Sequence, residues 1–244
     1  MLLRPLLPAA VALAGLVMAA PLRAAPSLEA LQDALNSTTP GALSAVLEAG
    51  AGLDPELVER QRLLLRQHFP DASWSVSAGA PLRDGRPTTQ ITVTGTRQNG
   101  AHRYRFEGQQ QLLLGASGAR FNSQQVLRES SLLRSGDADL KVSLLIPDAV
   151  LTGQRYDLDV VFDEPLDGAV VAGALKPVTA SELLRFQTPD LPLEALGGGG
   201  LFKSVQAPYQ PGSQTWAVLL VHPKGLVAAS KQVRVVADKA DLSL

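Results

Sequence analysis

The sequence lacks cysteine altogether and contains only three histidines. Without cysteine the chain can form no disulfide bond, no thiolate nucleophile and no cysteine-ligated metal site. His68, His102 and His222 stand too far apart in sequence for any two to form a local metal-ligand pair, and we predict neither a metal site nor a cofactor. The formal net charge is −1 and no block of like charge occurs. Electrostatics therefore gives no reason to expect binding to nucleic acid or to an anionic membrane.

The first 24 residues have the pattern of a secretory signal peptide. Arg4 gives an early positive charge, residues 9–20 are apolar and uncharged, and residues 21–24 end in small side chains. The apolar run is shorter than the roughly 18 residues that a membrane-spanning helix needs. We expect cleavage between Ala24 and Ala25, leaving no stable membrane anchor. The mature protein would then lie in the periplasm, or in the thylakoid lumen of a photosynthetic source. An uncleaved N-terminal anchor is the alternative.

Beyond the signal peptide, roughly 220 residues remain, which is more than a typical single domain holds. We expect one domain over residues 27–135 and a second over residues 140–238. The polar residues 134–139 between them have the composition of a linker.

Residues 27–69 are expected to form three helices. Ser27, Thr39 and Asp54 are suitable N-cap residues, and proline follows the last two at the first helical position. In the third helix, the spacing of the apolar residues predicts a buried face that begins at Leu57 and leaves Arg62 on the solvated side.

Long antiparallel strands follow the helices. Asn99-Gly100 lies between two alternating runs and favours a two-residue type I′ hairpin loop. Counting outward from this loop pairs Arg97 with His102, and it places Tyr104 on an inner face, opposite Gly95. The other face, with Thr94 and Arg105, is expected to be solvated.

A second turn at residues 115–118 would pair Leu112 with Phe121 and Gln110 with Ser123, although strands this long usually carry bulges that shift the count. Polar groups then lie among apolar neighbours on the inner face. A buried polar group without a partner costs about 1–3 kcal/mol, so this patch implies a ligand, water or mutual hydrogen bonds; a hydrated sheet edge is the alternative. The candidate pocket residues are Trp74, Arg97, His102, Tyr104, Gln110, Ser123 and Gln125.

Three N-terminal helices, followed by long strands paired around Asn99-Gly100, resemble the NTF2-like superfamily of cone-shaped α+β domains. The resemblance covers residues 27–135 and implies a long helix packed into a bent sheet, closing a pocket. The superfamily includes dehydratases and isomerases with acidic or histidine residues in that pocket, and many members without activity. The count above places no Asp or Glu on the inner face, which argues against catalysis.

The second half contains short strand candidates separated by turns, at residues 140–146, 155–162, 169–175, 202–207, 215–222 and 229–236. In residues 155–162 large apolar side chains alternate with polar ones, so Asp157 and Asp159 are expected on a solvated face rather than at a calcium site. Many short strands with punctuated turns predict an all-β sandwich. The segment resembles bacterial immunoglobulin-like domains without the cysteine pair of true immunoglobulins.

The sequence thus predicts an α+β N-terminal domain, with helices packed on a curved antiparallel sheet, followed by an all-β sandwich. The favoured function is an exported, soluble, non-catalytic module for binding or assembly in the bacterial envelope or thylakoid lumen. Its partner would be a small molecule or a protein. The alternative is a small-molecule enzyme of the isomerase or dehydratase type that uses the cone pocket.

Overall fold

The computed structural model describes residues 26–136, 140–164, 166, 168–179, 181–182 and 190–243. The predicted signal peptide, with its cleavage site between Ala24 and Ala25, and residues 137–139 of the expected linker lie outside the described residues. Within them the fold is mostly β, with few helices and one large, almost wholly antiparallel sheet. No helix of the described part is long and apolar enough to cross a membrane.

The three expected helices are present: α1 (Leu28–Asn36), α2 (Ala42–Val46) and α3 (Pro55–His68). Ser27 caps α1 by accepting a hydrogen bond from the Ala30 N–H, and Asp54 caps α3. The expected cap of α2 is wrong, because the helix begins after Gly41, which takes the left-handed conformation with φ 78°.

Twelve strands occur among the described residues. The bounds are β1 (Ser73–Gly79), β2 (Thr88–Asn99), β3 (His102–Ser117), β4 (Arg120–Gly136), β5 (Val142–Leu145), β6 (Ala149–Leu151), β7 (Arg155–Phe162), β8 (Ala172–Val178), β9 (Glu194–Ala195), β10 (Gly200–Gln206), β11 (Gly212–His222) and β12 (Gly225–Val236), followed by the 3-10 helix η1 (Lys239–Ser243). The large sheet has the order β1-β2-β3-β4-β12-β11-β8-β9, with β6 alongside β12, and a three-stranded sheet has the order β10-β7-β5.

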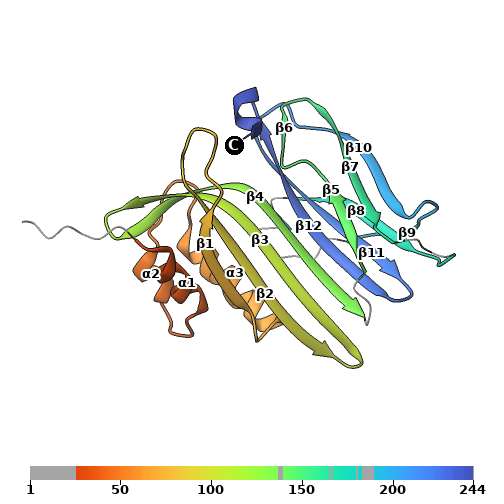
Figure 1. Cartoon of the computed structure of the whole chain (residues 1–244), viewed down its shortest axis with the longest axis horizontal. Helices are drawn as coiled ribbons and strands as arrows, with labels where there is room; N and C mark the ends of the chain where they lie inside the picture. Colours follow the sequence, from red (N-terminus) through yellow and green to blue (C-terminus); the bar gives the residue numbers. More distant parts are fainter. Residues whose placement is uncertain are drawn as a thin grey trace, which may run out of the picture.

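The large sheet is covered on opposite faces at its two ends (Figure 1). Leu132 and Leu133 of β4 show this arrangement, because neighbouring side chains on a strand point to opposite faces. Leu133 packs with the helices, whereas Leu132 packs with the core beneath the three-stranded sheet. The strand β4 therefore belongs to both halves of the molecule.

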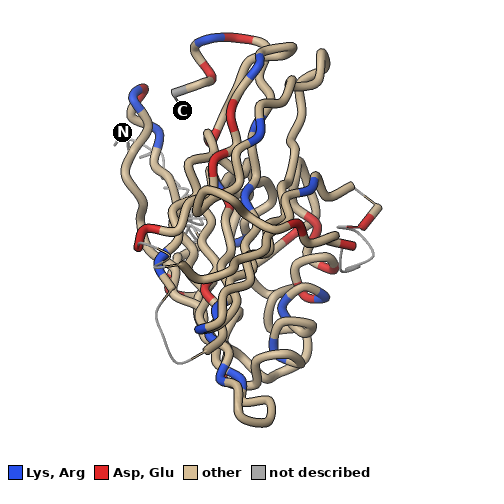
Figure 2. The backbone as a smooth tube through the Cα atoms, turned by 90° about the vertical axis from the view of Figure 1, so that its right-hand side faces the viewer, with Lys and Arg blue, Asp and Glu red and all other residues tan. Residues whose placement is uncertain are grey.

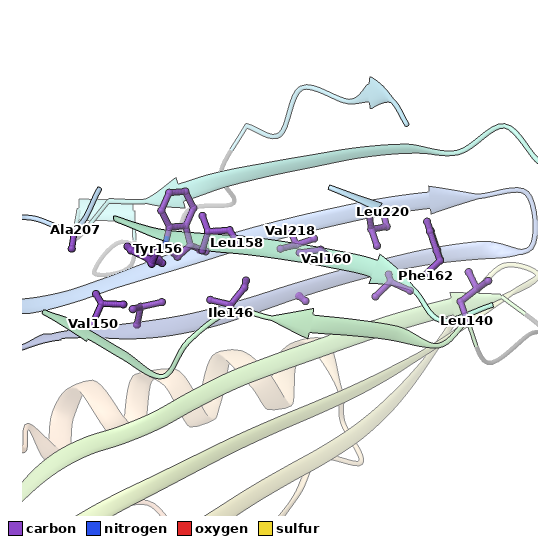
Figure 3. Close-up of a cluster of buried hydrophobic side chains, with 14 of the residues drawn as sticks. Leu140, Ile146, Val150, Tyr156, Leu158, Val160, Phe162, Ala207, Val218 and Leu220 are labelled. Carbon is purple, nitrogen blue, oxygen red and sulfur yellow. Dashed lines mark hydrogen bonds between the residues drawn. The ribbon is translucent and has the colours of Figure 1, made fainter. Parts of the chain in front are cut away.

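The two sheets enclose a closely packed core between β7 and β11–β12 (Figure 3). The alternation predicted for β7 is confirmed, since Tyr156, Leu158, Val160 and Phe162 are all buried. The polar groups of this core are paired: the Trp216 indole N–H donates to the Tyr156 hydroxyl, which in turn donates to Gln214. The core therefore leaves these aromatic polar atoms satisfied.

The two halves share backbone hydrogen bonds, because β4 pairs with β12 from Lys231↔Ser130 to Gly225↔Gly136. Residues 134–136 of the expected linker are consequently the end of β4 rather than a loop. The Ser131 and Ser230 hydroxyls also hydrogen-bond across this junction, 2.7 Å apart. The division into one domain over residues 27–135 and a second over residues 140–238 stays a prediction.

The expected register of the first hairpin is wrong by two residues, but the assignment of faces holds. Arg97 pairs with Tyr104 and Gly95 pairs with Phe106. Gly95 makes room for Phe69, which stacks on Phe106 with 5.3 Å between ring centroids. A shift by an even number preserves the alternation, and Tyr104 packs with the helical core.

The expected register between β3 and β4 is also wrong, because bulges interrupt it. The two strands are joined through Gly118-Ala119, and Leu112 pairs with Val126 rather than with Phe121. Register shifts occur between Gln111 and Leu112 and between Gly115 and Ala116. Each bulge inserts one residue into β4 and so reverses which of its side chains face the helices.

Candidate functional site

A cavity of about 290 Å³ lies between the helices and the inner face of the large sheet. Its walls come from α1 and α3 on one side and from β1 to β4 on the other. Most of the lining is apolar, with polar groups concentrated on β3 and β4. The apolar lining residues are Leu31, Leu35, Leu47, Leu53, Val58, Leu65, Trp74, Ile91, Val93, Phe106, Leu112 and Leu114.

The helical wall of the cavity is held in place by a buried arginine. Arg62 is only 5% exposed, which corrects the prediction that it lies on the solvated side of its helix. Its guanidinium donates twice to Glu59, at 2.7 Å each, and to the Ser37 carbonyl at 2.6 Å. Because Ser37 follows the last residue of α1, Arg62 caps that helix and fixes α3 against it. The hydrogen bond with Arg62 holds the pKa of Glu59 below its usual range.

Trp74 lies in the cavity wall because α1 docks along the free edge of β1. The Asn36 side chain accepts from the Trp74 N–H at 3.0 Å and donates to the Trp74 carbonyl at 2.7 Å. Gln32 accepts from the Val76 N–H at 2.9 Å in the same manner. These side chains replace a neighbouring strand at the sheet edge, which is otherwise open to unwanted pairing.

The polar end of the cavity is formed by Glu129 on β4 and Gln110 on β3, which pair directly across the two strands. The Gln110 amide donates to the Glu129 carboxylate with 3.1 Å between Nε2 and Oε2. Burial raises the pKa of Glu129, and the hydrogen bond from Gln110 opposes that rise only in part. The expectation that the inner face carries no acidic residue is therefore wrong.

The bulge next to Glu129 is supported from the second half of the chain. The shift between Gln111 and Leu112 leaves Leu127 as the extra residue of β4. Its backbone carbonyl accepts a hydrogen bond from the buried Arg234 of β12, at 3.0 Å. This contact gives a hydrogen-bond donor to a backbone carbonyl of the bulge, where the regular pairing of β4 with β3 is interrupted. Gln124, on the far side of the bulge, also lines the cavity.

Acidic and basic residues are interspersed along the chain as a whole (Figure 2), but the cavity itself carries little charge. Among the described residues that line it, only Glu129 and Arg62 are ionisable. Arg62 is already neutralised by Glu59. Elsewhere in the described ranges, no three His, Cys, Asp or Glu side chains lie close enough together to hold a metal ion.

The structure brings only two of the seven candidate residues into the cavity. Trp74 and Gln110 line it. Arg97 instead stacks on Tyr104, 5.4 Å from the ring centroid, near the end of the hairpin, and His102 is exposed beside the hairpin loop.

Ser123 and Gln125 fall outside the cavity because of the bulges in β4. Gln124, between them, lines the cavity, so alternation directs its two neighbours to the other face. Counting without bulges reverses this assignment.

Sequence reasoning missed Glu129, Gln124 and Arg62. Glu129 left a usable signal, because the alternation Leu127, Glu129, Ser131 and Leu133 continues the inner face beyond the point where the count ended. Nothing in the local pattern marks Arg62, whose burial depends on the end of α1.

Residues 137–236 match the profile of a family described as a domain of unknown function (DUF8623). The matched stretch begins one residue after β4 and ends at the last residue of β12. The lining residues of the cavity all precede it. No curated protein matches the chain.

Proposed function

We propose that this chain is an exported, non-catalytic binding protein that holds a small molecule between its helices and its sheet. In this proposal, residues 27–135 form an NTF2-like α+β domain and residues 140–238 form an immunoglobulin-like β-sandwich. The single observation that supports binding is the cavity of about 290 Å³. A mostly apolar cavity with a few converging polar groups is typical of small-molecule sites, although this one is at the lower end of their usual size.

The composition of the lining limits the occupant to a small, largely apolar molecule. The apolar side chains give affinity through burial, and the Glu129–Gln110 pair fixes orientation by hydrogen bonding. The second half of the chain supports the site from outside, through the contact between Arg234 and the β4 bulge.

Native mass spectrometry of the purified mature protein tests binding directly, because it detects a co-purifying molecule. Ile91→Trp would fill the cavity from β2, and Thr92→Trp, one residue along the same strand, points to the opposite face and serves as the control. We expect loss of the bound mass only in Ile91→Trp. Equal occupancy in both variants would place the molecule elsewhere.

Export is tested by N-terminal sequencing of the protein from its natural source, which should start at Ala25. An intact Met1 on a membrane-bound product would contradict the proposal that the protein is free after processing.

A second candidate function, proton transfer by an isomerase or dehydratase, is favoured by one observation. Glu129 is a carboxyl group with a raised pKa inside the cavity, as a general base requires. If this candidate is correct, a bound ketone such as 2-octanone should exchange its α-protons with solvent deuterium, and Glu129→Gln should stop the exchange. Absence of exchange in the wild-type protein would contradict this second candidate and leave ligand binding as the proposed function.

A further inference from the structure

Two acceptor oxygens at the polar end of the cavity receive no hydrogen bond from the described residues. Gln110 directs its Nε2 donor to Oε2 of Glu129, so its own carbonyl oxygen remains available as an acceptor. Within the described part of the chain, Glu129 receives this one hydrogen bond and forms no ion pair, which leaves Oε1 available as well. The nearby Ser131 hydroxyl is already paired with Ser230.

Among the described residues, no cationic side chain pairs with the carboxylate at this end of the cavity. Arg62 is the other ionisable residue among the lining residues that the structure describes, and its donors are committed to Glu59 and to the end of α1. The basic neighbour Arg128, one residue before Glu129, pairs instead with Asp148 at 2.8 Å. Lys231 binds the same Asp148 carboxylate.

We propose that the cavity takes ligands with one protonated amine on an apolar body, for which Glu129 supplies the counter-charge and Gln110 a second acceptor. This inference rests on the proposed binding function and names the ligand class for the same site. An ammonium group offers three donors and no acceptor, which complements the available oxygens. The apolar lining then receives the rest of the molecule.

The pairing makes binding depend on pH in a defined direction. Glu129 must be ionised to pair with an ammonium group, and burial raises its pKa above the usual 4.5. The ionisable groups facing the cavity are Glu129 on β4 and Arg62 on α3, since the other described lining residues are apolar, amide or hydroxyl side chains. Amine affinity therefore rises with pH through the pKa of Glu129, whereas the affinity of an uncharged analogue stays constant.

Isothermal titration calorimetry of the mature protein with octylamine, octanol and octanoate tests this inference. The three probes share one apolar chain and differ in the charge of the end group. We expect octylamine at pH 8 to bind about tenfold to a hundredfold more tightly than octanol, as expected for a hydrogen bond to a charged group, and octanoate to bind most weakly.

The matched variants are Glu129→Gln and Glu107→Gln. Glu107 lies on β3 but pairs with Thr94, on the face away from the helices, so its substitution removes the same charge outside the cavity. Glu129→Gln should remove the preference for octylamine, so that this variant binds octylamine and octanol with affinities within about threefold of each other, and its urea unfolding curve shows that it is folded. Glu107→Gln should change neither affinity.

The possible results distinguish a failure of the amine inference from a failure of the proposed binding function. Equal binding of octylamine and octanol, or a preference for octylamine that survives Glu129→Gln, overturns the amine inference and leaves small-molecule binding intact. Failure of all three probes to bind contradicts the proposed binding function itself.

Discussion

The two ends of the large sheet are covered by different structures, and they are filled differently. Under the three-stranded sheet the core is fully closed, and Leu158, Val160, Leu220, Val227 and Val233 are all 0% exposed. Under the helices, a cavity remains and the buried residues include the charged Arg62. One sheet therefore supports a closed core at one end and a potential site at the other.

The difference follows from the shapes of the two covers. Two twisted sheets can stay aligned, so their side chains interdigitate over the whole contact. A straight helix follows a twisted sheet over a shorter distance, and α1 and α3 are held by the polar contacts of Asn36 and Arg62 rather than by apolar packing alone. The helical half can therefore retain space without losing its fold.

The largest expected effect comes from truncating a side chain in the closed core. Leu158→Ala removes a fully buried side chain from the strand-covered half and should reduce the free energy of unfolding by about 2–5 kcal/mol. Leu65→Ala, beside the cavity, should cost about half as much, because free volume already lies next to it. Urea unfolding measures both, and equal losses would contradict the contrast between the halves.

A somewhat smaller loss should follow from removing the arginine that holds the helices. Arg62→Met breaks the pair with Glu59 and leaves the Ser37 carbonyl without its donor, which should cost about 2–3 kcal/mol. The pKa of Glu59 is lowered in the folded state, so the pair stabilises the fold above pH 4.5 and this contribution disappears as the pH falls through the folded pKa. The difference in the free energy of unfolding between wild type and variant should therefore be smaller at pH 3 than at pH 7, because the lost donor to Ser37 costs the same at both. A difference that does not change with pH would assign the whole effect to that hydrogen bond and to packing.

The contact between the halves should be worth about 1–3 kcal/mol, the cost of leaving one buried carbonyl unpaired. Arg234→Met removes the donor to Leu127 at the bulge of β4 and keeps much of the apolar stem. We expect lower stability together with weaker ligand binding in the cavity beside the bulge. Lower stability with unchanged binding would show that the bulge does not depend on this arginine.

The smallest expected effect on stability is a gain. The pKa of Glu129 is raised in the folded state, so the wild type loses stability as the pH rises from 4.5 through the folded pKa. Glu129→Gln should therefore be more stable than wild type at pH 7, by about 1.4 kcal/mol for each unit of the rise, and equal to it at pH 4. A variant less stable than wild type at pH 7 would mean that the carboxylate has a counter-charge in solution.

Local chemistry made part of this fold predictable. Ser27 and Asp54 are found at the helix starts that their side chains suggest, and alternation correctly identifies the buried side of β7. Tyr104 lies on the inner face as predicted, because the register of β2 against β3 differs from the expected one by two residues, and an even shift keeps each side chain on the same face. Such features depend on near neighbours in sequence.

The features that form the site depend on distant residues, and for this reason sequence patterns did not reveal them. The bulge at Leu127 is supported by Arg234, more than a hundred residues later, and Arg62 is buried by the end of α1. Pairing of β4 with β12 is equally non-local, and it turns part of the expected linker into strand. Of the seven candidate pocket residues, only Trp74 and Gln110 line the cavity.

Ligand is expected to enter the helix-covered half of the molecule and not the strand-covered half, and each half contains one tryptophan that can report binding. Trp74 lines the cavity, and Trp216 is 3% exposed in the closed core. Fluorine NMR of fluorotryptophan-labelled protein, with resonances assigned through Trp74→Phe and Trp216→Phe, can follow both during a titration with uncharged octanol. We expect a saturable shift of the Trp74 resonance, with the Trp216 resonance unchanged. A titration that moves Trp216 alone, or neither resonance, would contradict this expectation.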